Sequence, residues 1–207
     1  MLEASQIECV RGSRRLFRDL SFRLEAHQAL RVRGENGAGK TSLLRIVAGL
    51  SPAESGSVSW NDGSIRALGE DYLRDLLFLG HSNGLKDDLS PIENLRYALV
   101  LAGVVADEAA LRAALAEQAL TAIADLPVKL LSQGQKRRVA LTRLSFSAEK
   151  PLWILDEPFT ALDAAAVERL ARTITKQLQR GGMLMFTTHQ EVALPGTTMR
   201  TLELGVD

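Results

Sequence analysis

The chain has 207 residues, 46% of them hydrophobic and 24% charged, which is the composition of an ordinary globular protein with one domain and a substantial core. Lys and Arg together number 25, as do Asp and Glu, so the net charge is zero. This balance argues against nucleic acid as the main partner, because phosphate binding usually leaves a basic excess. The single cysteine, Cys9, excludes an internal disulfide, and in the alternating segment QIECV we expect it to be a buried small hydrophobe.

The first twelve residues, MLEASQIECVRG, contain no apolar stretch that could serve as a secretory signal. The longest apolar run, near YALVLAGVVA, is about half of the roughly 20 residues that a membrane-spanning helix needs. We therefore expect a cytosolic protein that reaches a membrane only by docking on another protein.

Residues 28–35, QALRVRGE, predict a buried strand, and a glycine loop separates it from a predicted helix over residues 40–50. Residues 151–157 and 181–189 predict two more buried strands. The segment between these two predicts a helix that ends at Gly181. Its apolar face contains Val167, Leu170, Ala171, Ile174 and Leu178. This alternation of strands and helices indicates a sheet covered by helices.

Residues 78–95, FLGHSNGLKDDLSPIENL, lead from a strand end through a polar loop into a helix. His81 follows the strand directly, and Ser90 with Glu93 predicts a capping box at the helix start. Residues 90–149 are rich in Ala and Leu and predict helices, with a break around DLPVKLLSQG. The economical description is a helical insertion within an α/β core.

Residues 34–41, GENGAGKT, fit the phosphate-loop pattern G-x-x-x-x-G-K-[ST] between a strand and a helix, which is the context that the pattern requires. Its glycines would let backbone N–H groups turn toward an anion, and the helix start adds its dipole. Lys40 would contact the terminal phosphates, and the Thr41 hydroxyl would ligate Mg²⁺. The alternative is a glycine turn that carries a lysine by chance, and the context favours nucleotide binding. The predicted binding residues are Gly34, Glu35, Asn36, Gly37, Ala38, Gly39, Lys40, Thr41 and Ser42.

Residues 152–158, LWILDEP, place Asp156 and Glu157 at the end of an apolar strand. Asp156 could hold Mg²⁺ through water, and Glu157 could accept a proton from the attacking water or orient it. The alternative is an N-cap acid with an exposed neighbour. The phosphate loop in the same chain favours the catalytic interpretation.

Residues 131–141, LSQGQKRRVAL, resemble the LSGGQ signature of ABC ATPases. The phosphate loop, the signature, the acidic strand, TALD and FTTHQ follow in that family's order over nearly the whole chain. The resemblance implies a P-loop NTPase with a RecA-like α/β core, over about residues 1–80 and 150–207, that carries an antiparallel β subdomain. It places a helical subdomain at about residues 81–149. It also implies a homodimer in which two ATP molecules lie between the subunits, head to tail.

The resemblance also implies roles for single residues. The signature residues would bind the γ-phosphate of the partner's ATP; they are Leu131, Ser132, Gln133, Gly134 and Gln135, where Gln133 departs from the usual glycine. His189 resembles the switch histidine, which bonds the γ-phosphate and aligns the attacking water beside Glu157 and Lys40. Asp163 lies in a loop that would contact the partner. We expect Lys136, Arg137 and Arg138 to form a solvated helix face, in preference to a further phosphate site.

Two positions depart from the family pattern. His81 falls where a glutamine usually contacts the Mg²⁺ shell, and it would fill that role with a neutral ring nitrogen. The alternative is a histidine that points to solvent. Arg11 falls where an aromatic residue usually stacks on adenine; its guanidinium plane could stack on the base, or it could be merely exposed.

With these departures and a short chain, the sequence is similar to one subgroup of the family, the ATP-binding subunits of the haem-exporter complex of cytochrome c maturation. That similarity implies integral membrane partners like CcmB and CcmC, docked between Leu85 and Leu95, and a peripheral place on the cytoplasmic face of the inner membrane. ATP hydrolysis would drive release of a haem-loaded chaperone, and no residue here is assigned to haem. The alternatives are the ATPase subunit of another small importer or exporter, a soluble ATP-gated clamp, and an ATP-binding scaffold without hydrolysis.

Overall fold

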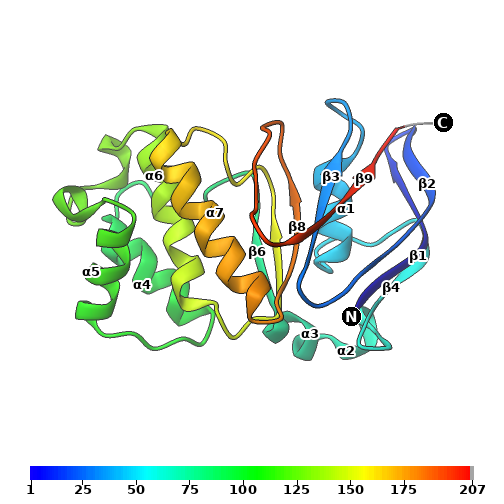
Figure 1. Ribbon diagram of the computed structural model, residues 1–207, viewed down its shortest axis with the longest axis horizontal. Coiled ribbons are helices and arrows are strands. Elements are labelled where there is room, and N and C mark those ends of the chain that lie inside the picture. The colour runs from blue at the N-terminus through cyan, green and yellow to red at the C-terminus, as the bar shows by residue number, and fades with distance from the viewer. Residues whose placement is uncertain (206–207) are drawn as a thin grey trace.

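Two sheets form the framework of the molecule, and a group of helices lies beyond one edge of the second sheet (Figure 1). The computed structural model describes residues 1–205. The first sheet is antiparallel with the order β2-β1-β4-β5, and the second is parallel with the order β6-β7-β8-β3-β9. The antiparallel strands are β1 (Leu2–Arg11), β2 (Arg14–Leu24), β4 (Ser55–Trp60) and β5 (Gly63–Ser64). The parallel strands are β3 (Gln28–Arg33), β6 (Leu76–Leu79), β7 (Leu152–Leu155), β8 (Met183–Thr187) and β9 (Thr198–Glu203).

The inner strands of the parallel sheet are apolar runs without alternation. Every residue of β7 and β8 is buried, which is expected of parallel strands that are covered on both faces. On one face α1 (Lys40–Val47) lies between the two sheets and shares a core with Ile7 of β1 and Ile154 of β7. Cys9 belongs to the same core, so the prediction of a buried small hydrophobe is confirmed.

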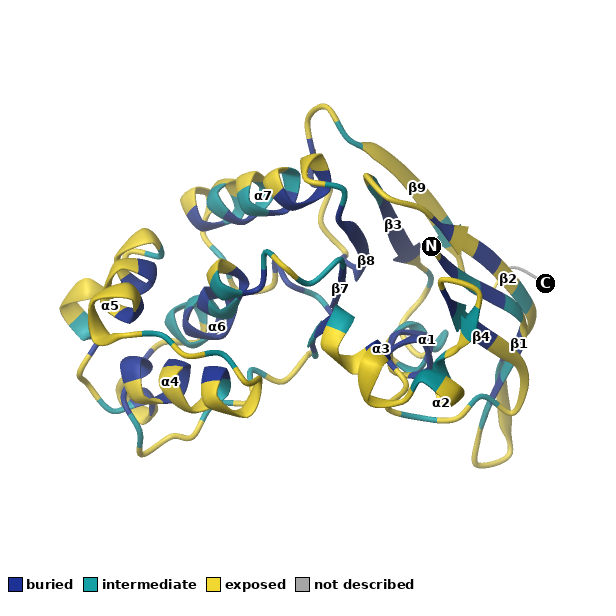
Figure 2. Ribbon diagram, turned by 90° about the horizontal axis from the view of Figure 1, so that it is seen from below, coloured by how far each residue is buried: buried dark blue, intermediate teal, exposed yellow. Residues whose placement is uncertain are grey.

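Helix α7 (Ala164–Gln179) covers the other face of the parallel sheet. Its residues Leu170, Ile174 and Leu178 are buried there, so the predicted apolar face is confirmed. Figure 2 shows this buried side of α7 turned toward the sheet and its exposed side turned away. The chain leaves the helix at Gly181, whose φ of 94° is accessible to glycine at little cost.

Between β6 and β7 the chain forms α4 (Pro91–Leu101), α5 (Glu108–Glu117) and α6 (Gln133–Leu141). These helices have a core of their own, in which Leu95 of α4, Leu111 of α5 and Val139 of α6 are buried together. The predicted capping box begins α4: the Glu93 carboxylate accepts from the Ser90 N–H at 2.8 Å. Two short helices, α2 (Ile65–Leu68) and α3 (Glu70–Asp75), and three 3₁₀ turns complete the chain: Thr121–Ile123, Val128–Leu130 and Thr142–Phe146.

The topology decides where polar side chains gather. Because β3, β6, β7 and β8 are parallel neighbours, the segments that follow them emerge at one edge of the sheet, which is where ligands bind in open α/β folds. No helix within residues 1–205 combines the length and the apolar character needed to cross a membrane.

Candidate functional site

A cavity of 330 Å³ lies at the carboxyl edge of the parallel sheet. Five segments far apart in the sequence line it: β2, the loop after β3 with the start of α1, His81 after β6, the acidic pair after β7 and His189 after β8. From the loop and the start of α1 come Asn36, Gly37, Gly39, Lys40, Thr41 and Ser42, and from β2 comes Leu16. The fold thus brings together the candidate residues that sequence motifs placed in separate segments.

The loop before α1 has the backbone that a phosphate cradle requires. Gly37 and Gly39 have φ values of 84° and 101°, in the region that favours glycine. A Cβ on Gly39 would also lie 3.0 Å from the Cβ of Leu16, so the close packing excludes a larger residue. The Lys40 ammonium lies over this loop, where it donates to the carbonyls of Gly34 at 2.7 Å and Glu35 at 3.1 Å. A cation and a helix N-terminus therefore meet at the same point, which suits an anion.

Asp156 is 1% exposed and both of its carboxylate oxygens accept from hydroxyl groups. Thr41 donates to Oδ2 at 2.8 Å and Thr187 donates to Oδ1 at 2.7 Å. The pair of Thr41 and Asp156 thus presents hard oxygen atoms beside the phosphate loop, as Mg²⁺ prefers. Thr187 was not among the predicted site residues, because at the end of β8 a threonine is an ordinary strand residue.

Glu157 is held in an unusual backbone conformation, with φ of 49°. Its N–H donates to the Thr187 hydroxyl at 2.8 Å. Among the described residues its buried Oε1 has no hydrogen-bond partner, and His189 Nε2 lies 3.4 Å from this atom. An unsatisfied buried acceptor in a cavity of this kind is suited to receive a hydrogen bond from water.

The two departures from the family pattern have different positions. His81 lines the cavity together with Lys40 and Glu157. Arg11 is exposed and is not among the residues that line the cavity. Arg14, its partner across the β1–β2 pair, extends Nη1 to 3.7 Å from the place where a Cβ on Gly37 would lie. No motif in the sequence pointed to Arg14.

The signature residues begin α6, and within residues 1–205 none of them lines the cavity around Lys40. Ser132 caps the helix: its hydroxyl accepts from the Gln135 N–H at 3.2 Å, and the Gln135 side chain accepts from its N–H at 2.8 Å. Ser132 and Gln133 are exposed, so this helix start faces solvent. Asp163, also exposed, caps α7 by accepting from the Ala166 N–H at 2.7 Å.

The predicted solvated face of α6 is wrong. Arg137 is only 5% exposed, because its guanidinium bonds to groups from the turns after β6 and β7. Burial lowers the pKa of this guanidinium, and the nearby carboxylates of Asp156 and Glu157 oppose that shift. Lys136 pairs with Asp87 at 3.1 Å, and Arg138 donates to a backbone carbonyl of the helical region at 2.9 Å.

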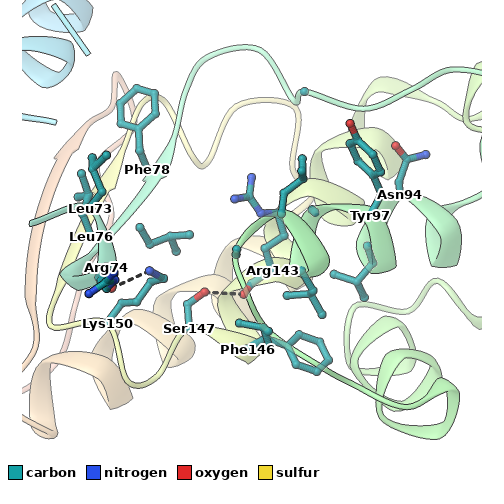
Figure 3. A pocket seen from close by; sticks show the side chains of 18 of the residues that line it. Leu73, Arg74, Leu76, Phe78, Asn94, Tyr97, Arg143, Phe146, Ser147 and Lys150 are labelled. Carbon is teal, nitrogen blue, oxygen red and sulfur yellow. Dashed lines mark hydrogen bonds between the residues drawn. The ribbon is translucent and has the colours of Figure 1, made fainter. Parts of the chain in front are cut away.

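A second cavity, a groove of 1020 Å³, lies between the β6 region and the helices. Figure 3 shows Leu73, Leu76 and Phe78 on one side of it and Tyr97 and Phe146 on the other. On the side of Leu73 and Leu76 the Lys150 ammonium donates to the Arg74 carbonyl at 2.7 Å. Leu73 and Tyr97 are large apolar side chains that stay 49% and 46% exposed, so the groove offers apolar surface to another molecule.

The sequence and the fold of this chain are similar to those of known proteins. A family model for ABC transporters matches residues 17–160. The cytochrome c biogenesis ATP-binding export protein CcmA of Dechloromonas aromatica is 53% identical over 205 residues, which are 99% of this chain and 100% of that protein. The chain belongs to the CcmA family of ABC transporter ATP-binding proteins.

Other CcmA proteins are similar over nearly the full length. That of Nitrosomonas europaea is 48% identical over 99% of this chain and 95% of its own, and that of Vibrio cholerae is 44% identical over 99% of both. A solved ATP-binding subunit of an ABC transporter has a TM-score of 0.79 at 26% identity and covers 91% of this chain and 79% of its own. CcmA membership confirms the predicted fold class, ATP binding and the predicted role as an ATP-binding export subunit in cytochrome c biogenesis.

Proposed function

We propose that two copies of this chain hydrolyse ATP head to tail and pass the resulting movement to integral membrane subunits of a haem-exporting complex. The observation that carries the proposal is the buried Oε1 of Glu157, which has no hydrogen-bond partner within residues 1–205 and lies in one cavity with Lys40 and the pair of Thr41 and Asp156. An acid that can accept from water beside a phosphate cradle is the arrangement that ATP hydrolysis needs.

In this proposal each residue of the cavity has one task. Lys40 and the loop N–H groups bind the β- and γ-phosphates. Thr41 and Asp156 hold Mg²⁺, which when bound neutralises negative charge that develops on the phosphate oxygens. Glu157 accepts the proton of the attacking water, and His189 keeps that water in line. His81 takes the place of the usual glutamine, in the same cavity as the two residues that would hold Mg²⁺.

The position of the signature supports a dimer. Ser132 and Gln133 expose a capped helix start, with its positive dipole end, away from the residues that line the chain's own cavity. A second copy, turned head to tail, would bring its signature N–H groups and Ser132 hydroxyl to the γ-phosphate bound by the first copy. The loop of Asp163 would lie at the contact between the copies. A solved ATP-binding cassette, dimeric and bound to ADP and phosphate, has a similar fold. It superposes on this chain with a TM-score of 0.78 at 21% identity, over 92% of this chain and 88% of its own.

The groove supports a docking place for the membrane partner. Leu85 and Leu95 line it, together with the exposed apolar side chains of Leu73 and Tyr97. An amphipathic helix of an integral subunit like CcmB or CcmC would bury its apolar face here. This docking would keep the chain on the cytoplasmic face of the inner membrane as a peripheral subunit.

The catalytic part of the proposal is tested by Glu157→Gln. The amide cannot take the proton, so turnover should fall by about 100-fold or more while ATP binding persists, and the ATP-bound dimer should accumulate. The molecular mass in solution, measured with and without ATP, reports dimer formation, and a hydrolysis assay reports turnover. The matched control is Glu168→Gln on the exposed face of α7, where the carboxylate pairs with Arg172. Hydrolysis that Glu157→Gln leaves unchanged would refute the proposal.

A further inference from the structure

Arg137 is a buried cation on the signature helix, and none of its hydrogen-bond partners within residues 1–205 is a carboxylate. Its guanidinium instead donates to four backbone carbonyls and one side-chain amide. The acceptors are the carbonyls of Asp156 at 2.8 Å, Glu157 at 2.9 Å, Gly80 at 3.3 Å and Pro158 at 3.4 Å, and Asn83 Oδ1 at 3.0 Å. A charge with this little exposure is tolerated only where every donor finds a partner.

These five acceptors belong to two turns. Gly80 and Asn83 flank His81 after β6, and residues 156–158 form the acidic turn after β7. One planar guanidinium therefore ties α6 to two of the turns that place side chains in the nucleotide cavity. A lysine could not reproduce this fork, because its single ammonium cannot reach acceptors on both sides at once.

Glu157 needs such support because of its backbone. A φ of 49° is unfavourable for a residue with a Cβ and persists only where the surroundings fix it. The Thr187 hydroxyl accepts from the N–H of Glu157 at 2.8 Å, and Arg137 donates to its carbonyl at 2.9 Å. The residue is thus held from both ends, which fixes the direction in which its carboxylate enters the cavity.

We propose that Arg137 is a positioning residue for hydrolysis, which holds Glu157 in its strained conformation and joins that residue to the helix that begins with the signature. The proposal rests on the proposed function, in which Glu157 is the general base. Because Ser132 caps the short helix that contains Arg137, contact of Ser132 with the partner's nucleotide is mechanically coupled to the placement of the chain's own base.

The first test compares Arg137→Gln and Arg137→Lys in the complex isolated with its membrane partners. Misplacement of Glu157 should lower kcat by about ten- to a hundredfold for Arg137→Gln, while KM for ATP changes by less than about threefold. Arg137→Lys keeps the charge, and its kcat should lie between that of the unchanged chain and that of Arg137→Gln. The matched control is Arg138→Gln, one position along the helix. Among the described residues this guanidinium donates only to the carbonyls of Gln118 and Ala119, so its loss should leave kcat close to that of the unchanged chain.

The second test separates positioning from general damage to the fold. If Arg137 acts through Glu157, then in the Glu157→Gln background Arg137→Gln should lower the residual single-turnover rate by less than about twofold. An equal loss in both backgrounds would overturn the inference while leaving Glu157 as the base. If Glu157→Gln itself costs no activity, the proposed function fails. Should Arg137→Gln melt below the assay temperature, Arg137→Lys carries the same comparison.

Discussion

Two arginines of the first hairpin, Arg11 and Arg14, lie opposite each other near the phosphate loop. The family resemblance places an adenine-stacking aromatic at Arg11, yet Arg14 is the one whose Nη1 approaches Gly37, and Leu16 lines the cavity beside it. Guanidinium planes stack on aromatic rings, and an aliphatic side chain can cover the other edge of a base. We therefore expect adenine to lie against Arg14 and Leu16, with Arg11 in a lesser role.

Replacing Arg14 by alanine should raise KM for ATP by about threefold or more and change kcat less, because stacking contributes to binding of the ground state and the transition state alike. Arg11→Ala should raise KM by a smaller factor. Steady-state kinetics report both values. Arg15→Ala is the control, because that side chain is held by Glu8 at 2.6 Å. An unchanged KM in Arg14→Ala would rule out the stacking role.

At the scale of single elements, the start of α6 is packed directly on the loop before α7. A Cβ added to Gly134 would lie 2.6 Å from the carbonyl oxygen of Ala161, in the TALD segment. Ala161 has φ of 63°, a left-handed conformation that is unfavourable for a residue with a Cβ. The glycine of the signature is therefore required by packing within one chain, in addition to any approach to phosphate.

The substitution Gly134→Ala tests this packing by the sign of its effect. In an ordinary helix, alanine is more stable than glycine by up to about 1 kcal/mol. Here the overlap with Ala161 should reverse the sign and lower the free energy of unfolding by about 1–3 kcal/mol. Urea denaturation measures the change. A higher free energy of unfolding in Gly134→Ala would contradict the prediction, because it would mean that the loop before α7 shifts to accommodate the added Cβ.

At the scale of the whole molecule, the nucleotide cavity and the groove share the segment from β6 to α4. His81 lines the cavity, and Leu85 and Leu95, further along the same segment, line the groove. Asn94 fixes the loop between Leu85 and α4, since its side-chain amide accepts from the Lys86 N–H at 2.8 Å and donates to the Leu89 carbonyl at 3.2 Å. A partner docked in the groove would therefore act on the segment that carries His81.

This arrangement predicts a selective loss of membrane partners. Leu73→Glu introduces a charge into the apolar side of the groove and should abolish co-isolation of integral membrane proteins. Val105→Glu is the matched control, because Val105 is 99% exposed and does not line the groove. Affinity isolation from membranes, followed by identification of the accompanying proteins, gives the answer. Equal recovery with both variants would place the docking site elsewhere.

Features that depend on local sequence patterns could be predicted from the sequence. The apolar face of α7 and the capping box of Ser90 follow from spacing along one helix, and the structure contains both. The pairing of β1 with β2 and β4, with shifts of register after Ala4 and Ser5, depends on contacts between distant segments that periodicity does not encode. The burial of Arg137 was missed for the same reason: a run of three basic letters says nothing of the carbonyls that converge on one of them from two other turns.

The central claim is that each site for hydrolysis is built from two copies of the chain. It is tested most directly by mixing two inactive variants in the assembled complex: Lys40→Ala, with an intact signature, and Ser132→Trp, with an intact phosphate loop. A mixed dimer contains one undamaged site, so ATP hydrolysis should return on mixing, although neither variant is active alone. If the mixture stays inactive, or if Ser132→Trp alone hydrolyses ATP at the full rate, the claim is contradicted.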